Sequence, residues 1–249
     1  MVKPLPRSGA ESVFSYMGWG DVGVTRDNCY DYAFGDDHKR SVKSVPGDRS
    51  GKKFANSNFT SCRGFVRRVL ADNPKTVYRC KNPNAVCRRG YYKVMAFVAP
   101  TNNYGNSTGD FHWYKQHKAV RYRIRAGDTI TGLARFFKVS PLTIKKALLK
   151  QSRPLKNDDG MIANKNMNIS MRQRGPALKP GRIITFPINA WSHKQGWATG
   201  PLLIDASGKL ITDPRKANRK YGYNYSKFCS AFCIKAGKVH TGRNKSNLF

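Results

Sequence analysis

The chain has 249 residues and a formal charge of +32, from 46 lysines and arginines against 14 acidic residues. Its 39% hydrophobic and 12% aromatic content is enough to bury a core, which excludes a disordered polycation. No run approaches the roughly 20 apolar residues of a membrane span, and the N-terminus lacks the apolar stretch of a signal peptide, so neither a transmembrane segment nor Sec-type secretion is expected.

The first informative element is a short helix predicted within residues 27–34, which begins at a cysteine. Cys29 lies at its start, and Asp27 or Asn28 supplies the cap. A helix N-terminus lowers the pKa of a thiol through its free N–H groups and its dipole. We therefore expect Cys29 to favour the nucleophilic thiolate.

Two predicted strands follow at residues 91–98 and 110–115, and His112 lies near the start of the second. His193 comes much later, in the segment 190–194, which precedes two further apolar runs separated by a Ser-Gly turn. The remaining histidines have no comparable setting and should be solvated: His38, His117 and His240.

Between these histidines, residues 122–187 predict a strand, two short helices and a strand. Gly127 permits a tight turn, and Asp128 or Thr129 can cap the first helix. Apolar residues at i, i+3, i+4 and i+7 define that helix: Ile130, Leu133, Ala134 and Phe137. Ser140-Pro141 starts a second helix, which carries Leu142, Ile144, Ala147 and Leu148. A Pro-Gly turn and a β-branched run close the segment.

This order resembles the LysM domain, over residues 121–188. LysM modules bind N-acetylglucosamine-containing glycans, and the resemblance implies a glycan site in the loop after the first strand, at Gly127, Asp128, Thr129 and Ile130. A long polar and basic insertion at 151–177 departs from the pattern and would cover or rebuild the glycan-binding groove. The resemblance therefore supports the fold more strongly than it supports the sugar specificity. The alternative is an ordinary β-α-α-β unit without a ligand.

A cysteine at a helix start, followed by two histidines on adjacent strands, resembles the papain-like hydrolases of the NlpC type. The resemblance implies that Cys29 is the nucleophile, His112 the base and His193 the residue that orients the base. Trp113 and Tyr114 depart from the family's small-residue context and would crowd a substrate cleft. We therefore predict an α+β chain with a discontinuous papain-like domain, an antiparallel sheet plus helices, and an inserted βααβ LysM domain. The boundaries are an N-terminal arm at 1–26, the papain-like domain at 27–120 and 189–235, the LysM domain at 121–188, and a basic tail at 236–249.

All six cysteines lie outside the LysM-like segment: Cys29, Cys62, Cys80, Cys87, Cys229 and Cys233. If Cys29 is the nucleophile, an odd number remains, so either one further thiol stays free or Cys29 is itself bridged. The spacings are not those of zinc fingers, which favours disulfides or free core thiols over a metal, and no cofactor is expected. Without a signal peptide, disulfides would indicate oxidation in an assembled particle or in a special compartment.

The basic residues are spread through the whole chain, and such an excess repels itself unless anionic partners neutralise it. Nucleic acid, an anionic membrane surface, anionic glycans and acidic protein neighbours all fit this charge. No known nucleic-acid recognition motif is visible, which argues against sequence-specific binding.

Three functions are consistent with these features. The favoured hypothesis is structural: a minor or cementing protein of a virion, in which the LysM module and an inactive cysteine-hydrolase-like domain bind acidic or capsid protein neighbours. The alternative is a papain-like cysteine peptidase or amidase that cuts peptidoglycan or a glycopeptide, at the cell wall or outside the cell without a Sec signal. The third is a basic glycan- or nucleic-acid-binding protein without catalysis. A live enzyme needs the Cys29 sulfur within hydrogen-bond reach of His112, beside an open cleft.

Overall fold

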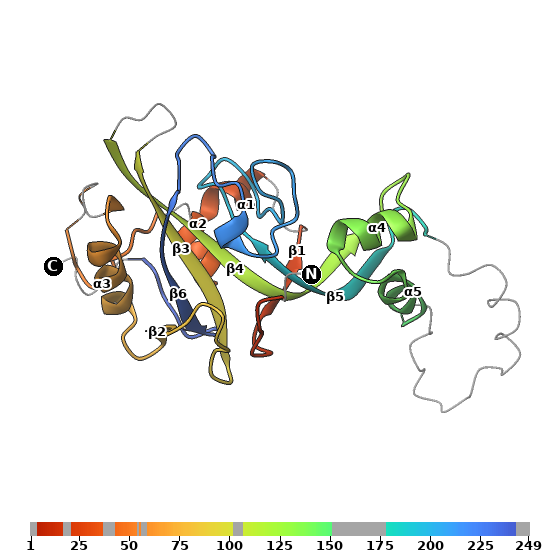
Figure 1. Ribbon diagram of the computed structural model, residues 1–249, viewed down its shortest axis with the longest axis horizontal. Helices are drawn as coiled ribbons and strands as arrows, with labels where there is room; N and C mark the ends of the chain where they lie inside the picture. Colours follow the sequence, from red (N-terminus) through yellow and green to blue (C-terminus); the bar gives the residue numbers. More distant parts are fainter. Residues whose placement is uncertain are drawn as a thin grey trace, which may run out of the picture. The chain divides into compact units, whose positions relative to one another are not determined.

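The computed structural model describes residues 4–16, 21–36, 43–53, 55, 59–101, 107–150 and 178–242 (Figure 1). The chain divides into two compact units, one made of residues 1–118 and 189–249 and the other of residues 119–188. His38 and the insertion expected at 151–177 lie outside the described residues.

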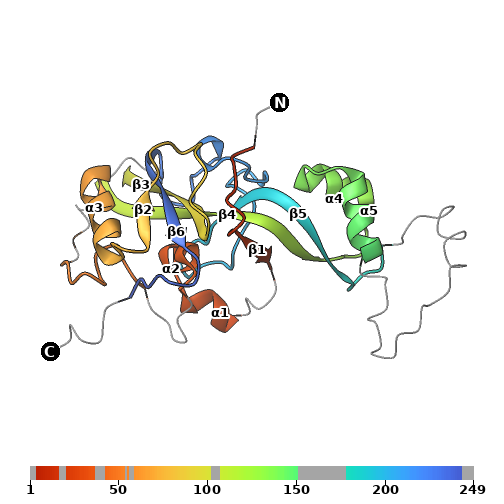
Figure 2. The ribbon, with the colours of Figure 1, turned by 90° about the horizontal axis from the view of Figure 1, so that it is seen from below.

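A six-stranded sheet has the strand order β1-β4-β3-β6-β2, with β5 paired to β4. The strands are β1 (Ser12–Ser15), β2 (Val77–Arg79), β3 (Tyr91–Thr101), β4 (Ser107–Arg123), β5 (Ile183–Ser192) and β6 (Lys227–Lys235). β3 pairs antiparallel with both β4 and β6, and β2 pairs antiparallel with β6. Figures 1 and 2 show β3 running beside β4 and β6. With few helices around this sheet, the architecture is compatible with the expected α+β class.

Both faces of the sheet in the first unit are covered by aromatic and apolar side chains. The helices of this unit are α1 (Asp21–Arg26), α2 (Cys29–Phe34), α3 (Cys62–Asp72) and the 3-10 helix η3 (Pro214–Lys216). On one face, Tyr30 of α2 stacks on Trp113 of β4, with ring centroids 5.4 Å apart. The next residue, Tyr114, joins a second core cluster that includes Trp191 and Tyr225. Successive residues of a strand point to opposite faces, so Trp113 and Tyr114 belong to two different cores.

The segments expected as an N-terminal arm and a basic tail contribute to the first unit. Leu5 and Phe14 are buried, and β1 is an edge strand of the sheet. Near the other end of the chain, Val239 and Thr241 are buried as well. Within the described residues, none of the helices has the length and apolar character needed to cross a bilayer.

Two disulfides join residues that are far apart in the sequence, Cys62 with Cys229 and Cys87 with Cys233. Cys29 and Cys80 are free and buried. The expected disulfides are therefore confirmed. Of the two alternatives left open by the odd number, the structure has the first: Cys29 is not bridged, and one further thiol stays free.

The second unit contains the end of β4, the helices α4 (Ile130–Phe137) and α5 (Pro141–Lys150), and the start of β5. Its buried helical residues are those that the periodicity marked, Leu133, Ala134, Phe137, Ile144, Ala147 and Leu148. Leu142 differs, since it is 56% exposed at the first turn of α5. The Ile124 N–H donates to the Arg182 carbonyl and the Gly181 N–H donates to the Ile124 carbonyl, each at 2.8 Å, and these bonds join the residues that follow β4 to those that precede β5.

Candidate active site

The local structure around Cys29 is a well-capped helix start. The Asn28 side chain accepts hydrogen bonds from the backbone N–H groups of Tyr30 (2.8 Å) and Asp31 (3.1 Å), and Asp31 bonds back to the Asn28 N–H. Of the two caps considered, the structure uses Asn28. The backbone N–H of Cys29 has no hydrogen-bond partner among the described residues. Cys29 thus offers a thiol and a free backbone donor at one point.

The thiol itself is buried and neutral. Its sulfur donates to the carbonyl oxygen of Phe111 at 3.7 Å and accepts a hydrogen bond from the backbone N–H of Trp113. Burial, followed by the charges of Asp110 and Asp31, raises the pKa of Cys29 well above its usual range, although Lys194 opposes this. The expectation of a thiolate is therefore wrong for this state, because desolvation and two carboxylates outweigh the helix N-terminus.

His112 and His193, predicted from the sequence as a pair, are hydrogen-bonded to each other. His112 Nε2 lies 2.9 Å from His193 Nδ1, and His193 Nε2 lies 2.9 Å from the carbonyl oxygen of Ile204. A carbonyl only accepts, so His193 Nε2 carries a proton and, in the neutral ring, its Nδ1 is an acceptor. His112 Nε2 must then be the donor, which leaves a lone pair on His112 Nδ1. Among the described residues, that nitrogen has no hydrogen-bond partner.

Aromatic rings hold both imidazoles in place and keep them neutral. His112 stacks on Tyr225 with ring centroids 4.8 Å apart, and His193 stacks on Tyr221 at 4.7 Å. Burial lowers the pKa of His112 well below its usual range and lowers the pKa of His193 to about 4. At neutral pH the two rings are therefore an uncharged, hydrogen-bonded pair with one lone pair left over, on His112 Nδ1.

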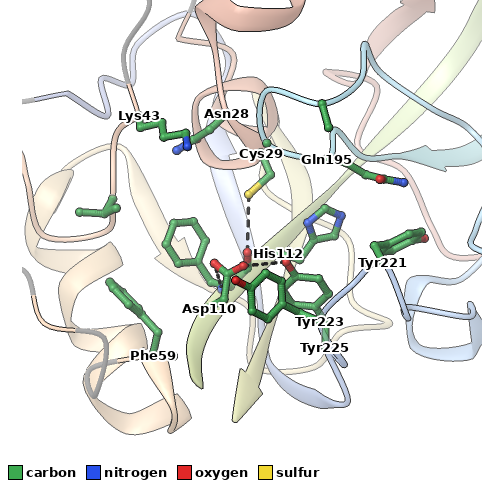
Figure 3. A pocket seen from close by; sticks show the side chains of 15 residues that line it. Asn28, Cys29, Lys43, Phe59, Asp110, His112, Gln195, Tyr221, Tyr223 and Tyr225 are labelled. Atoms are coloured by element: carbon green, nitrogen blue, oxygen red, sulfur yellow. Dashed lines mark hydrogen bonds between the residues drawn. The ribbon is translucent and has the colours of Figure 1, made fainter. Parts of the chain in front are cut away.

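Cys29 and His112 line the same pocket, which has a volume of about 450 Å³ (Figure 3). His193 does not line this pocket, and its ring centroid lies 5.0 Å from that of His112. The Cys29 sulfur is hydrogen-bonded to the Phe111 carbonyl, and no hydrogen bond joins it to His112. Trp113 and Tyr114 do not line this pocket, so the prediction that they crowd the substrate cleft is wrong. Trp113 is buried in the core on one face of β4, and Tyr114 is buried in the core on the other face.

No family model matches this sequence, and neither a curated protein nor a solved structure matches it. The LysM-like and NlpC-like interpretations therefore depend on the residues and the geometry of this chain.

Four residues near the thiol were not predicted. Asp110 lies in the pocket wall, where its carboxylate accepts hydrogen bonds from the Tyr225 hydroxyl and the Phe111 N–H, both at 2.8 Å. Lys194 donates to the carbonyls of Val24 (2.5 Å) and Gly196, and burial lowers its pKa to about 8. Asp110 lies two residues before His112, and Lys194 directly follows His193, so their position in the sequence could have indicated that they belong to the site. Tyr221 and Tyr225 carry no such signal, because only the fold brings them under the rings.

Replacing Asp110 with asparagine should make Cys29 more reactive. The amide keeps the hydrogen-bond acceptor for Tyr225 but removes a negative charge that raises the pKa of the thiol. We expect roughly 3- to 10-fold faster alkylation of Cys29 at pH 8, which corresponds to a pKa lower by about half a unit to one unit. The measurement is iodoacetamide labelling against pH, with Tyr225→Phe as the control that keeps the charge. An unchanged midpoint in Asp110→Asn would show that the thiol does not sense this carboxylate.

His117 is a second correction, because it is buried rather than solvated. Its Nε2 lies 2.6 Å from the Ser192 hydroxyl, which is also 2.6 Å from the Tyr32 hydroxyl, and its Nδ1 lies 3.1 Å from the Ser12 hydroxyl. Burial lowers the pKa of His117 to about 3. The ring is enclosed by Ser12 of β1, Ser192 of β5 and Tyr32 of α2. His240 is exposed, as expected.

The four residues of the expected glycan site lie in the turn before α4. Gly127 has a positive φ of 83°. The Asp128 carboxylate accepts hydrogen bonds from the Arg125 N–H (2.7 Å) and the Tyr122 hydroxyl (3.0 Å), and the Thr129 hydroxyl caps α4. Ile130 is half-buried at the first position of that helix. The Asp128 and Thr129 side chains thus build the turn.

Proposed function

We propose that the first unit carries a papain-like, NlpC-type cysteine hydrolase site that cuts an amide bond. The observation that supports this best is the hydrogen bond between His112 and His193. It fixes a basic nitrogen in the same pocket as a free cysteine at a helix start. A core histidine pair without a catalytic role would not need a neighbouring thiol or a pocket of about 450 Å³.

The reaction follows from these positions. The Cys29 thiol turns from the Phe111 carbonyl towards His112, and its proton passes to His112 Nδ1 as the sulfur attacks the carbonyl carbon. The negative charge that develops on the carbonyl oxygen is stabilised by the free N–H of Cys29. The amine leaves with the proton held by His112. Water then hydrolyses the thioester, which releases the acid and restores the thiol. His193 keeps the second nitrogen of His112 in the donor state throughout.

For the second unit we propose a LysM domain that holds a glycan containing N-acetylglucosamine, through the backbone of the turn at Gly127, Asp128, Thr129 and Ile130. The strand-helix-helix-strand order and the capped turn support this assignment. A glycan holder and an amidase on one chain suit a glycopeptide polymer such as peptidoglycan, with the cut in its peptide part.

The test is incubation of purified peptidoglycan with the full chain, followed by measurement of new amino groups. The wild type should release amines, and Cys29→Ala should reduce the release to background because the nucleophile is gone. Co-sedimentation of Cys29→Ala with the polymer separates holding from cutting. If the chain binds the polymer but the wild type releases no amines, the result would support the glycan-binding domain and contradict the hydrolase.

A second candidate is favoured by the neutral, buried thiol and by the charge of +32. In this proposal the chain is a cementing protein of a virion, whose cysteine-hydrolase-like unit has lost catalysis and binds acidic capsid neighbours. It predicts no amine release from the wild type. It also predicts salt-sensitive binding to acidic proteins, which Cys29→Ala would retain in full.

A further inference from the structure

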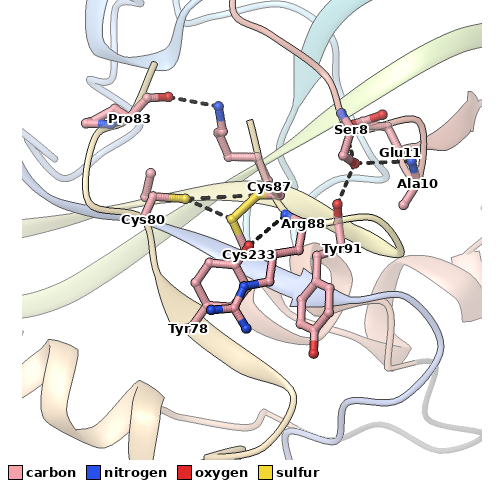
Figure 4. Close-up of a disulfide and its surroundings, with 12 residues drawn as sticks. Ser8, Ala10, Glu11, Tyr78, Cys80, Pro83, Cys87, Arg88, Tyr91 and Cys233 are labelled. Atoms are coloured by element: carbon pink, nitrogen blue, oxygen red, sulfur yellow. Dashed lines mark hydrogen bonds between the residues drawn. A yellow bond between two sulfur atoms is a disulfide. The ribbon is translucent and has the colours of Figure 1, made fainter. Parts of the chain in front are cut away.

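The free thiol of Cys80 lies against a disulfide in the first unit, away from the pocket described above (Figure 4). Its sulfur is 2.9 Å from the sulfur of Cys233 and 4.0 Å from that of Cys87, while Cys87 and Cys233 are bonded to each other. All three residues are buried, with 7%, 6% and 1% exposure for Cys80, Cys87 and Cys233. Cys233 therefore has two sulfur neighbours and a bond to only one of them.

The register of the sheet places Cys80 there. Tyr78 of β2 pairs with Cys233 of β6, and the backbone N–H of Cys80 donates to the Ala231 carbonyl at 2.9 Å, which continues the pairing. Cys80 comes two residues after Tyr78, so both side chains point to the same face as that of Cys233. Cys80 and Cys233 are thus diagonal neighbours on paired strands, and their closeness is built into the backbone.

A buried lysine faces this cluster. Lys93 of β3 pairs with Cys233 on the other side of β6, is 1% exposed, and donates to the Pro83 carbonyl at 2.9 Å. Burial raises the pKa of Cys80, and the charge of Lys93 lowers it. The other charged groups that act on Lys93 are Glu11, Asp213 and Arg215. A cation beside a thiol stabilises the thiolate, which is the form that attacks disulfides.

We propose that Cys80, Cys87 and Cys233 form a thiol–disulfide exchange site with two alternative pairings. The Cys80 thiolate attacks the sulfur of Cys233, the bond between Cys233 and Cys87 breaks, and Cys87 leaves as a thiolate. Cys87 then takes up the proton that Cys80 gave up. One disulfide is broken and one is formed, so no external oxidant or reductant is consumed.

The exchange alters one wall of a second pocket. Asn84, Ala85 and Val86 lie between the two exchanging cysteines, and they line a pocket of about 720 Å³ together with Leu5 and Arg215. With Cys87 paired, this loop is tied to β6 at its C-terminal end. When Cys80 is paired with Cys233, the C-terminal end of this loop has no covalent bond to β6. The disulfide then joins β6 to the residue that follows β2. The sulfurs of the three cysteines lie within 4.8 Å of one another, but the disulfide leaves only Cys80 as a free thiol that could ionise, so the oxidised site suits exchange rather than metal binding.

The test is disulfide mapping of the full chain. Wild-type protein is incubated at pH 6 or pH 9, quenched with acid, alkylated with N-ethylmaleimide at low pH and digested with trypsin. Lys81 separates Cys80 from Cys87, so the two pairings give peptides of different mass. We expect Cys87–Cys233 at pH 6 and a Cys80–Cys233 peptide that accumulates at pH 9. In Cys87→Ser no disulfide remains for Cys80 to attack, so air must oxidise the Cys80 and Cys233 thiols to join them, and this variant serves only to give the reference mass of the Cys80–Cys233 peptide.

Cys80→Ser is the matched control and should contain only Cys87–Cys233 at both pH values. Cys229 and Cys233 share the tryptic peptide 228–235, so each product also carries the Cys62 peptide, and fragmentation of the product assigns the two bonds. The bond between Cys62 and Cys229 thus serves as an internal reference for oxidised protein. A Cys80–Cys233 peptide in the wild type supports the exchange. If the wild type lacks this peptide at both pH values while the reference bond is intact, the site is a static disulfide and the proposal is overturned.

Discussion

Replacing His193 with alanine should lower kcat/KM for amide cleavage by about 10²- to 10⁴-fold, although this side chain does not line the pocket. His193 acts through the proton position on His112. Without the acceptor Nδ1 of His193, the His112 proton is free to move to its own Nδ1, which then meets the thiol as a donor and not as a base. This result would make His193 a positioning residue for the proposed reaction.

A conservative variant separates this role from a loss of packing. The amide oxygen of glutamine can accept the His112 Nε2 proton, so His193→Gln should recover a large part of the rate. The comparison uses kcat/KM on peptidoglycan peptides, with circular dichroism to confirm that both variants are folded. Equal activity in His193→Ala and the wild type would contradict the proton relay, and equal loss in both variants would indicate packing alone.

Acid should destabilise the folded chain by several kcal/mol through His117. Its pKa is about 3 in the folded state against an ordinary 6.5, so the unfolded chain binds the proton more readily. A histidine with a depressed folded pKa contributes stability that is present above pH 6.5 and is lost as the pH falls towards 3. At about 1.4 kcal/mol per unit, the loss approaches 5 kcal/mol from this group over that range.

Urea unfolding between pH 7.5 and pH 4 measures the part of this loss that falls above pH 4, about 3.5 kcal/mol. His117→Gln keeps a polar side chain but cannot titrate, so its unfolding free energy should fall less steeply with acid than that of the wild type. Ser192→Ala is the control, since it removes a hydrogen-bond partner of His117 while the ring still titrates. A slope in His117→Gln that equals the wild-type slope would assign the acid lability to other groups, such as His193.

The sequence was a good guide wherever a local pattern determines the outcome. The helix that begins at Cys29 follows from a capping residue, and the buried faces of α4 and α5 follow from helical spacing. The pairing of His112 with His193 required one further step, the assumption that the two segments form neighbouring strands. The bond between the rings agrees with that assumption.

What the sequence could not supply depends on burial by distant segments. The thiol of Cys29 was expected to be ionised from its helix alone, but the groups that keep it neutral include Asp110 of β4. His117 was expected to be solvated because its surroundings in the sequence do not resemble those of His112 or His193, yet Ser12 and Ser192 from other strands enclose it. Such effects arise from tertiary contacts, and the spacing of residues along the chain does not predict them.

The bond between Cys62 and Cys229 closes a covalent ring that contains the whole second unit, residues 119–188. A protease that cut the chain anywhere within that ring would leave a single covalent molecule, with its two fragments joined through α3 and β6. The nick would be visible on a gel only after reduction. A single cut within residues 119–188 would therefore not release a fragment until a reductant opened the bond between Cys62 and Cys229 and the bond between Cys87 and Cys233.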